Sequence, residues 1–321
     1  MKEIYDILRE WNKRRGESPS RTGIFALATL VRAEGSSYRR PGARMLIFED
    51  GKTVGSLSAG CLEEEVALCA REVLQTGEAA MMTFDTRRRF GCAGKIDIFI
   101  EQIPENFLSE LAMDLEARRS CFVMTTRRDG SFVGEAASFP SGKDREANSF
   151  PYRQNSALLA QEIHPPLRLL VFGDGPDNGP LRSLGRLLGW EIVEIADPNS
   201  ISIEPDQWTA AIVKSHNYGR DYVALQKLLP LDLRYVGLVG PRKRRDQVMN
   251  DLLDLGITVN AGFFAPAGLD LGAETPEEIA LAIVSEIQRV FAKGSGDSLR
   301  ERKVAIHQTA PVPNTWQKLP Q

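Results

Sequence analysis

Residues 167–179 read Leu167-Arg-Leu-Leu-Val-Phe172 and then Gly173-Asp-Gly175-Pro-Asp-Asn-Gly179. The apolar run predicts a buried strand, and the glycines allow a sharp turn whose backbone amides can approach a pyrophosphate. A helical pattern of leucines follows, so a helix N-terminus would add partial positive charge at the turn. The next predicted strand, 191–195, ends beside Asp197, where an acid commonly binds a ribose hydroxyl. This stretch predicts a dinucleotide fold.

The same alternation continues toward the C-terminus. Strands are predicted at 210–214 and 235–239, each followed by a helical pattern. Thr275-Pro-Glu-Glu278 has the form of a capping box that starts a last helix. Alternating strands and helices with short loops indicate a parallel sheet covered on both faces. We therefore predict a Rossmann-like, doubly wound domain over residues 167–293.

Whether a nucleotide binds this domain is left open by its glycine-rich turn. The glycine spacing is G-x-G-x-x-x-G, and Asp174 and Asp177 place carboxylates where phosphate would lie. A plain strand-to-helix turn is an equal alternative. His216 ends a strand at the edge where ligands bind in such sheets, although a histidine there can simply hydrogen-bond a loop. The candidate nucleotide-type loop consists of Gly173, Gly175, Gly179, Asp197 and His216, and the cofactor it would take is NAD(P).

The first part of the chain has the pattern of an α+β domain, which we place at residues 1–134. A helix is expected at 2–15 and a hairpin that turns at Asp50-Gly51. Another helix is expected to open at Ser58-Ala-Gly-Cys61. Residues 135–166 have little periodicity and are interpreted as an excursion and linker, and residues 294–321 as an extended tail. The fold class is therefore α/β, with an N-terminal α+β domain before the Rossmann-like domain.

Composition and charge exclude several classes of protein. The formal net charge is −3, which gives no general attraction to nucleic acid or to an anionic membrane. Charged residues interrupt the first turns, so no signal peptide is predicted, and no run is long enough to span a bilayer. The four cysteines match no zinc or iron–sulfur spacing. A cytoplasmic protein with free thiols is expected.

Two glycine-framed cysteines are the candidate chemical groups of the first domain. Cys61 follows Gly60 at the expected helix start, where the helix dipole favours thiolate and the glutamates of the first turn oppose it. Cys92 lies between Gly91 and Ala93, just after three arginines. For any single cysteine, a small buried hydrophobe is the usual alternative. Arg39, Arg40 and Arg44 could hold a phosphate or simply face solvent.

Several sequence blocks in one order resemble the XdhC/CoxI family. The N-terminal blocks are Gly35-Ser-Ser-Tyr-Arg-Arg-Pro-Gly42, Gly55-Ser-Leu-Ser-Ala-Gly-Cys-Leu-Glu63 and Phe90-Gly-Cys-Ala-Gly94. Two further blocks, 237–244 and 265–279, are similar to the C-terminal motifs of that family. The resemblance implies a maturation factor that binds molybdenum cofactor, protects it during sulfuration and delivers it to an apo molybdenum hydroxylase of the xanthine or CO dehydrogenase type. A cysteine desulfurase would be a second partner, and a homodimer is a further expectation.

Three functional hypotheses follow. The leading one is a cofactor-insertion chaperone rather than an enzyme, in which thiolates, as soft ligands, hold the metal–sulfur end of the cargo. Its expected metal-side ligands are Cys61 and Cys92, and its expected ligand-binding residues are Ser58, Gly60, Cys61, Glu63, Gly91, Cys92, Arg39 and Arg40. The alternatives are an NAD(P)-dependent oxidoreductase that uses the Rossmann-like domain, and a sulfur-transfer enzyme that carries a persulfide on one of the two cysteines.

Overall fold

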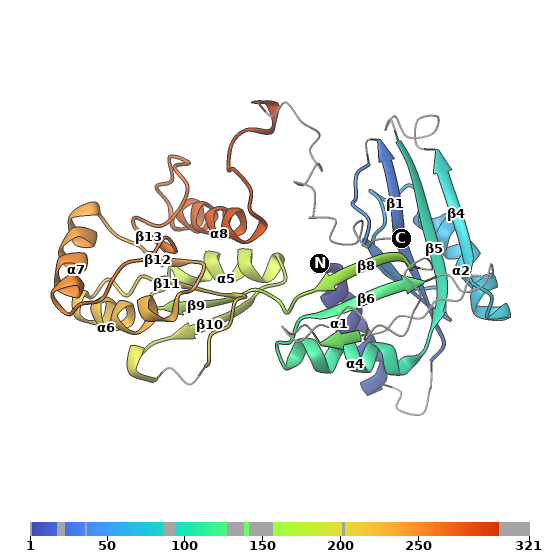
Figure 1. Ribbon diagram of the computed structural model, residues 1–321, viewed down its shortest axis with the longest axis horizontal. Coiled ribbons are helices and arrows are strands. Elements are labelled where there is room, and N and C mark those ends of the chain that lie inside the picture. The colour runs from blue at the N-terminus through green and yellow to red at the C-terminus, as the bar shows by residue number, and fades with distance from the viewer. Residues whose placement is uncertain are drawn as a thin grey trace, which may run out of the picture. The chain divides into compact units, whose positions relative to one another are not determined.

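The computed structural model describes residues 2–17, 23–35, 37–85, 94–126, 138–140, 157–200 and 203–301. The chain divides into two compact units (Figure 1). The second unit is Pro166–Asp297, and the remaining described residues form the first. Within the described residues, no helix is long and apolar enough to cross a membrane.

The first unit is built on a five-stranded antiparallel sheet with the strand order β3-β2-β1-β5-β4. Its elements are α1 (Lys2–Glu17), β1 (Phe25–Gly35), β2 (Arg44–Phe48), β3 (Thr53–Gly55), α2 (Glu63–Thr76), β4 (Ala80–Asp85), β5 (Gly94–Ile103) and α4 (Glu105–Glu116). The predicted hairpin is present, since β2 and β3 pair around Asp50-Gly51 and Gly51 has the positive φ of +80° that such a turn needs.

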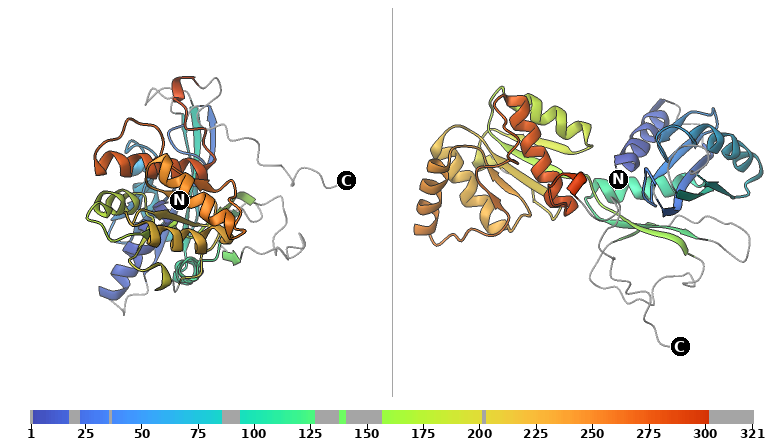
Figure 2. Two further views of the ribbon diagram at one scale, coloured as in Figure 1. Left: turned by 90° about the vertical axis from the view of Figure 1, so that its left-hand side faces the viewer. Right: turned by 90° about the horizontal axis from the view of Figure 1, so that it is seen from above.

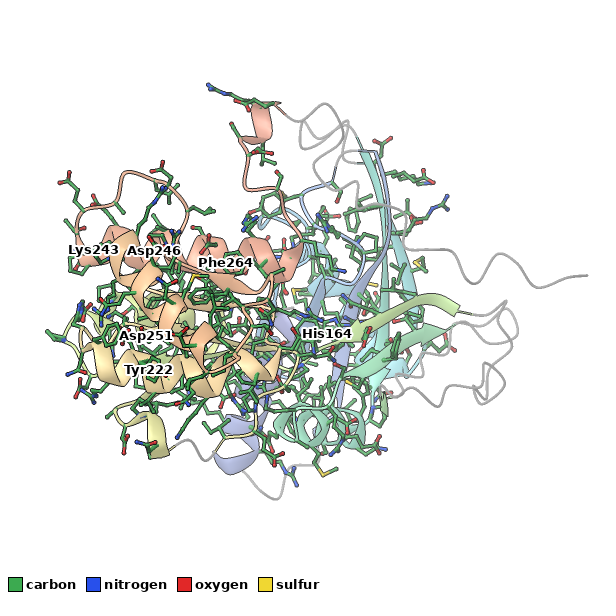
Figure 3. All side chains as sticks on the ribbon, turned by 60° about the vertical axis from the view of Figure 1, so that its left-hand side comes forward. His164, Tyr222, Lys243, Asp246, Asp251 and Phe264 are labelled. Carbon is green, nitrogen blue, oxygen red and sulfur yellow. The ribbon has the colours of Figure 1, made fainter. Side chains whose placement is uncertain are left out.

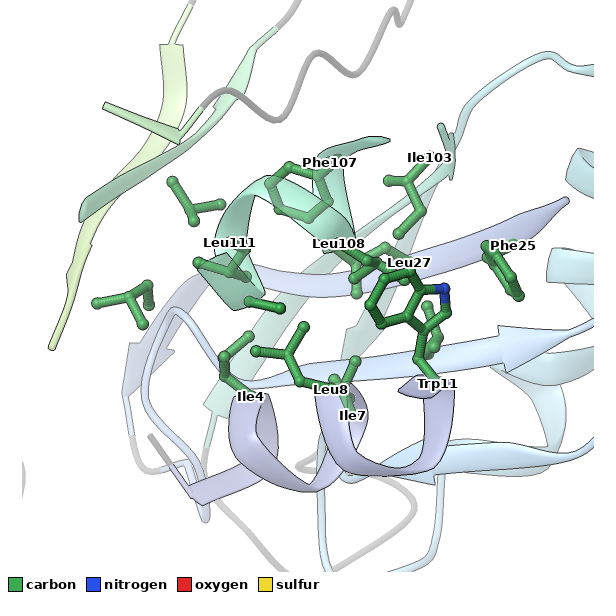
Figure 4. Close-up of a cluster of buried hydrophobic side chains, with 14 of the residues drawn as sticks. Ile4, Ile7, Leu8, Trp11, Phe25, Leu27, Ile103, Phe107, Leu108 and Leu111 are labelled. Atoms are coloured by element: carbon green, nitrogen blue, oxygen red, sulfur yellow. The ribbon is translucent and has the colours of Figure 1, made fainter. Parts of the chain in front are cut away.

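Helices α1 and α4 cover one face of this sheet. Their apolar side chains meet those of alternate strand residues, because successive residues of a strand point to opposite faces. Figure 4 shows this cluster, to which α1 contributes Ile4, Ile7, Leu8 and Trp11, α4 contributes Phe107, Leu108 and Leu111, and the strands contribute Phe25, Leu27 and Ile103. Trp11 is 2% exposed. The expected amphipathic helix at the start of the chain is therefore confirmed.

Helix α2 covers the opposite face. It buries Val66, Ala70 and Val73 against strand residues of the other alternation, including Ala26 and Ala28. Small alanines on β1 allow the helix to approach the sheet closely. This part of the unit thus has three layers, which are helices α1 and α4, the five-stranded sheet, and helix α2.

Two charged side chains are buried in the first unit on the face that α1 and α4 cover. Arg44 of β2 and Glu101 of β5 are each 1% exposed. Arg44 Nη1 donates to the Gly42 carbonyl at 3.0 Å and to Gln161 Oε1. Among the described residues, neither carboxylate oxygen of Glu101 has a hydrogen-bond partner. Burial raises the pKa of Glu101 to about 8, and the nearby charge of Arg44 lowers it only in part.

A small three-stranded sheet completes the first unit. Its strands are β6 (Cys121–Thr126), β7 (Ser138–Pro140) and β8 (Ala157–Ile163), in the order β7-β6-β8. Residues 135–166 were expected to be an excursion and linker, but β7 and β8 fall inside that range and pair with β6. The first unit therefore extends past residue 134. β8 forms a strand through its backbone pairing with β6, which the hydrophobic periodicity of the sequence did not predict.

The second unit is a parallel sheet between two layers of helices (Figure 2). Its elements are β9 (Arg168–Phe172), α5 (Asn178–Leu187), β10 (Glu191–Ile195), β11 (Thr209–Val213), α6 (Tyr218–Leu228), β12 (Val236–Leu238), α7 (Arg242–Asp254), β13 (Phe263–Phe264) and α8 (Pro276–Ala292). The strand order is β10-β9-β11-β12-β13. Helices α5 and α8 pack on one face and α6 and α7 on the other. The Rossmann-like prediction is confirmed.

The last helix begins as predicted. Thr275 Oγ1 accepts from the Glu278 amide, and Glu278 reaches back to the Thr275 amide, so the capping box is complete. The two-residue strand β13 is an addition to the predicted set of strands. Of the expected tail, the described part ends at Glu301 and contains one short 3-10 helix, Leu299–Glu301.

Candidate functional site

The candidate site in the first unit is the thiol loop, which we define as Ser56–Glu63. It joins the end of β3 to α2. The helix was expected to open at Ser58-Ala-Gly-Cys61, but it begins at Glu63, and the residues before it form a turn. The reason is that the Glu63 side chain folds back over the turn.

Glu63 accepts hydrogen bonds from most of the loop. Its Oε1 accepts from the amides of Leu57 at 3.1 Å and Ser58 at 2.8 Å, and from Ser56 Oγ at 3.1 Å. Its Oε2 accepts from Ser58 Oγ at 2.8 Å and from the Leu62 amide at 3.1 Å. Burial opposes ionisation, but the donors from Ser58 and the neighbouring amides outweigh it and lower the pKa of Glu63 to about 2.

Ser58 connects the Glu63 carboxylate to the backbone of Cys61. Its Oγ accepts from the amides of Gly60 and Cys61, both at 3.2 Å. Cys61 is exposed, and a Cβ placed on Gly60 would meet no atom of the described residues within 4 Å. Gly60 also has a φ of +108°, which other residues rarely adopt. The turn therefore holds a free thiol at the surface of the described part of the unit.

The thiol loop lies toward the end of the sheet where β4 ends and β5 begins. Gly77, just after α2, lies beside Gln102 near the end of β5. A helix of 14 residues is about 21 Å long, so the first residues of α2 lie near the beginning of β5 rather than near its end. Consistent with this, Leu62 shares a buried cluster with Phe84 of β4 and Ile96 of β5.

The second cysteine turn connects those two strands in the chain. Gly91 and Cys92, both expected ligand-binding residues, lie outside the described residues. The strand after them, β5, begins at Gly94, which is paired with Gly35. Within the described part of the chain, no group of three or more His, Cys, Asp or Glu residues could hold a metal ion by itself.

Of the three arginines expected to hold phosphate or face solvent, Arg44 does neither, because it begins β2 and is 1% exposed. The other two lie on the loop between β1 and β2. The guanidinium group of Arg39 forms an ion pair with Glu3 of α1. Arg40 is exposed. The structure therefore uses Arg39 to attach this loop to the first helix, and a role for it in binding phosphate would require Glu3 to release it.

In the second unit, the position where ligands bind in such sheets lies between β9 and β11. Chain order and strand order diverge there, since β10 lies on one side of β9 and β11 on the other. The Gly173 turn and the residues after β11 meet at this point. A Cβ on Gly173 would lie 2.9 Å from the Lys214 carbonyl oxygen, so only glycine fits.

Lys214 is the principal residue that sequence reasoning missed at this position. It is 4% exposed, and its Nζ lies 2.6 Å from Asp177 Oδ2 and 2.7 Å from Asn178 Oδ1. His216 Nε2 lies 3.6 Å from the same Asp177 oxygen, and His216 has a φ of +55°. Burial opposes ionisation, but Lys214 and His216 hold the pKa of Asp177 below its usual value. The sequence carried no signal for Lys214, because it simply follows an apolar run.

The turn is filled by the chain's own groups. The Asp177 carboxylate folds over Gly175, where an added Cβ would lie 2.2 Å from Asp177 Oδ1. Gly179 has open space among the described residues where a Cβ would be, so that glycine is not demanded by crowding. Asp174 pairs with Arg220 at 3.3 Å. The two carboxylates place negative charge at the turn, which favours the interpretation as a strand-to-helix turn.

The remaining candidate, Asp197, shapes its own loop. Its Oδ1 accepts from the Asn199 amide at 2.9 Å as a short 3-10 helix begins at Pro198. Nearby, Arg244 of α7 pairs with Asp221, whose side chain is fully buried. Lys243 lies on the exposed side of α7 (Figure 3). In the basic run at the start of α7, Arg244 is thus partly buried by its ion pair with Asp221, whereas Lys243 faces solvent.

These features define a class of protein: an α+β unit presenting a thiol loop, followed in the chain by a Rossmann-like unit. Two family models match, the XdhC and CoxI family over residues 20–85 and the XdhC Rossmann domain over residues 169–287. The chain belongs to the XdhC/CoxI family.

Named relatives agree with this assignment. The chain is 29% identical over 311 residues to a protein of Bacillus subtilis (strain 168) named as a probable xanthine dehydrogenase subunit, covering 81% of this chain and 91% of that protein. It is 25% identical over 288 residues to the molybdenum cofactor insertion chaperone PaoD of Escherichia coli (strain K12), covering 85% of each. A crystal structure described as a xanthine dehydrogenase from Bacillus halodurans has the same fold, with a TM-score of 0.73 and 24% identity over 89% of this chain and 97% of that one.

Proposed function

We propose that this protein is a maturation factor that binds molybdenum cofactor and assists its sulfuration and insertion into a molybdenum hydroxylase. The observation that carries the proposal is the exposed thiol of Cys61 on a turn fixed by Glu63. A thiolate is a soft ligand that suits a molybdenum–sulfur centre. The relative named as a molybdenum cofactor insertion chaperone supports the same role.

The proposal assigns different work to the two units. Cys61 and Cys92 contact the metal–sulfur end of the cargo, and Arg40 contributes positive charge for its phosphate. The Rossmann-like unit provides surface for the partners, an apo hydroxylase and a cysteine desulfurase. Work in the reducing cytoplasm, where thiols stay free, and assembly as a homodimer belong to the same proposal.

The proposal is tested by purifying the full chain from cells that make molybdenum cofactor and measuring bound pterin and molybdenum. The wild type is expected to retain both, and Cys61→Ala and Cys92→Ala are expected to lose them. Cys69→Ala is the matched control, because Cys69 lies within α2 and packs against a buried cluster. A wild type without pterin, or a Cys61→Ala variant that retains it as the wild type does, contradicts the proposal.

Sulfuration is tested by incubating the loaded protein with a cysteine desulfurase and its cysteine substrate. We expect the new sulfur on the released cofactor and an unchanged protein mass. An added mass of about 32 Da on Cys61, one sulfur atom bound as a persulfide, would instead identify a sulfur carrier.

A further inference from the structure

The hydroxyl group of Ser58 has one proton and two lone pairs, and its neighbours decide how they are used. Glu63 Oε2 lies 2.8 Å from Ser58 Oγ, and an ionised carboxylate can only accept hydrogen bonds. The hydroxyl must therefore donate to Glu63. Its lone pairs are then free for the Gly60 and Cys61 amides, both at 3.2 Å.

We propose that Glu63 is a positioning residue that acts on Cys61 through Ser58. With the hydroxyl direction set, the Cys61 amide is held toward the inside of the turn and the thiol stays on its exposed side. This inference rests on the proposed function, since the position of the thiol matters only if its sulfur meets the cargo. It also assigns Glu63, first expected to bind ligand, to the support of the loop.

The arrangement requires a carboxylate rather than an amide of the same shape. Both oxygens of Glu63 face amide donors, Leu57 and Ser58 on one side and Leu62 on the other. In a glutamine, one of the two positions becomes an NH2 group, which only donates. Either orientation of the amide then sets donor against donor. The Glu63→Gln variant therefore tests the charge and acceptor capacity without removing any side-chain volume.

The first experiment measures amide hydrogen exchange in the full-length protein. Glu63→Gln is expected to speed exchange at Gly60, Cys61 and Leu62 by about tenfold or more, because a charge-assisted bond of this kind contributes at least that factor. Amides of α2 beyond Val66 should exchange as in the wild type, which shows that the helix has folded. Glu64→Gln, an exposed neighbour, is the control. Unchanged exchange at the three loop amides overturns the inference.

A second pair of variants tests the hydroxyl itself. Ser58→Thr retains the donor and acceptors and is expected to exchange, and to retain pterin, as the wild type does. Ser58→Ala is expected to exchange faster at the loop amides and to lose the bound pterin.

The two proposals fail separately. If Cys61→Ala retains pterin, the proposed function fails, while the exchange data still test whether Glu63 positions Cys61 through Ser58. If Cys61→Ala loses pterin but Glu63→Gln and Ser58→Ala retain it, the proposed function stands and the positioning role is wrong.

Discussion

The ammonium group of Lys214 lies 2.6 Å from Asp177 Oδ2, joining the end of β11 to the glycine turn after β9. Because Lys214 is 4% exposed, its ammonium group contacts this carboxylate and Asn178 Oδ1 in place of bulk water. The pair therefore links the two strands at the point where the fold usually admits a ligand.

Removing the carboxylate should destabilise the second unit. Asp177→Ala leaves a buried ammonium group with one acceptor, and we expect a loss of about 2–4 kcal/mol in the free energy of unfolding. Hydrogen exchange of the β9 and β11 amides measures it. The double variant Asp177→Ala/Lys214→Met should recover most of the loss, since no charge remains buried. A double variant no more stable than the single one would show that the pair is not the cause.

Pyridine nucleotides are expected not to bind the wild type. Asp174 and Asp177 place negative charge at the turn, and Asp177 already fills the space over Gly175. Titration followed by nicotinamide fluorescence should show no saturable change. Saturable binding that is lost in His216→Ala would return the oxidoreductase hypothesis to consideration.

The buried Glu101 predicts a stability that falls as pH rises. Its pKa is raised from 4.5 to about 8 in the folded protein, so the unfolded chain loses this proton first. The folded state is thus increasingly disfavoured between these pH values, by roughly 1.4 kcal/mol for each unit of pKa difference. Unfolding measured across that range should show a shallower decline for Glu101→Gln. Glu116→Gln, at an exposed position, should follow the wild type; equal slopes for all three proteins would contradict the assignment.

The start of α8 offers a local test. Thr275→Ala removes the acceptor for the Glu278 amide and should cost about 1 kcal/mol. Thr275→Ser keeps the oxygen and should cost much less. Thermal melting of the two variants gives the comparison, and similar melting temperatures for both would show that the cap contributes little.

Elements whose sequence pattern matches their environment could be predicted. The α1 face of Ile4, Ile7, Leu8 and Trp11 is buried as its spacing indicates, and the capping box of α8 is complete. The strands of the second unit were recognisable because both of their faces are covered, which requires continuous apolar runs.

Features that depend on charges in unusual places could not be predicted. A lysine at a strand end is ordinarily solvated, so nothing marked Lys214 as buried. Glu63 does lie in the first turn of α2, as interpreted, but nothing in the sequence indicated that its side chain accepts hydrogen bonds from five donors of the preceding loop. Arg44 and Glu101 are far apart in the chain, and only the strand order brings them to one face. Cys92 lies outside the described residues, so its expected role beside Cys61 as a metal-side ligand stays a prediction.

The hydrogen bonds that connect Glu63, Ser58 and Cys61 all lie within one short stretch of chain, Ser56–Glu63. Leu57 and Leu62, each 1% exposed, attach the same stretch to the buried cluster between α2 and the sheet. The loop is therefore fixed twice, by local hydrogen bonds among its polar groups and by two apolar side chains inserted into the core. A change in the core beneath α2 would thus be transmitted to the turn that carries the thiol.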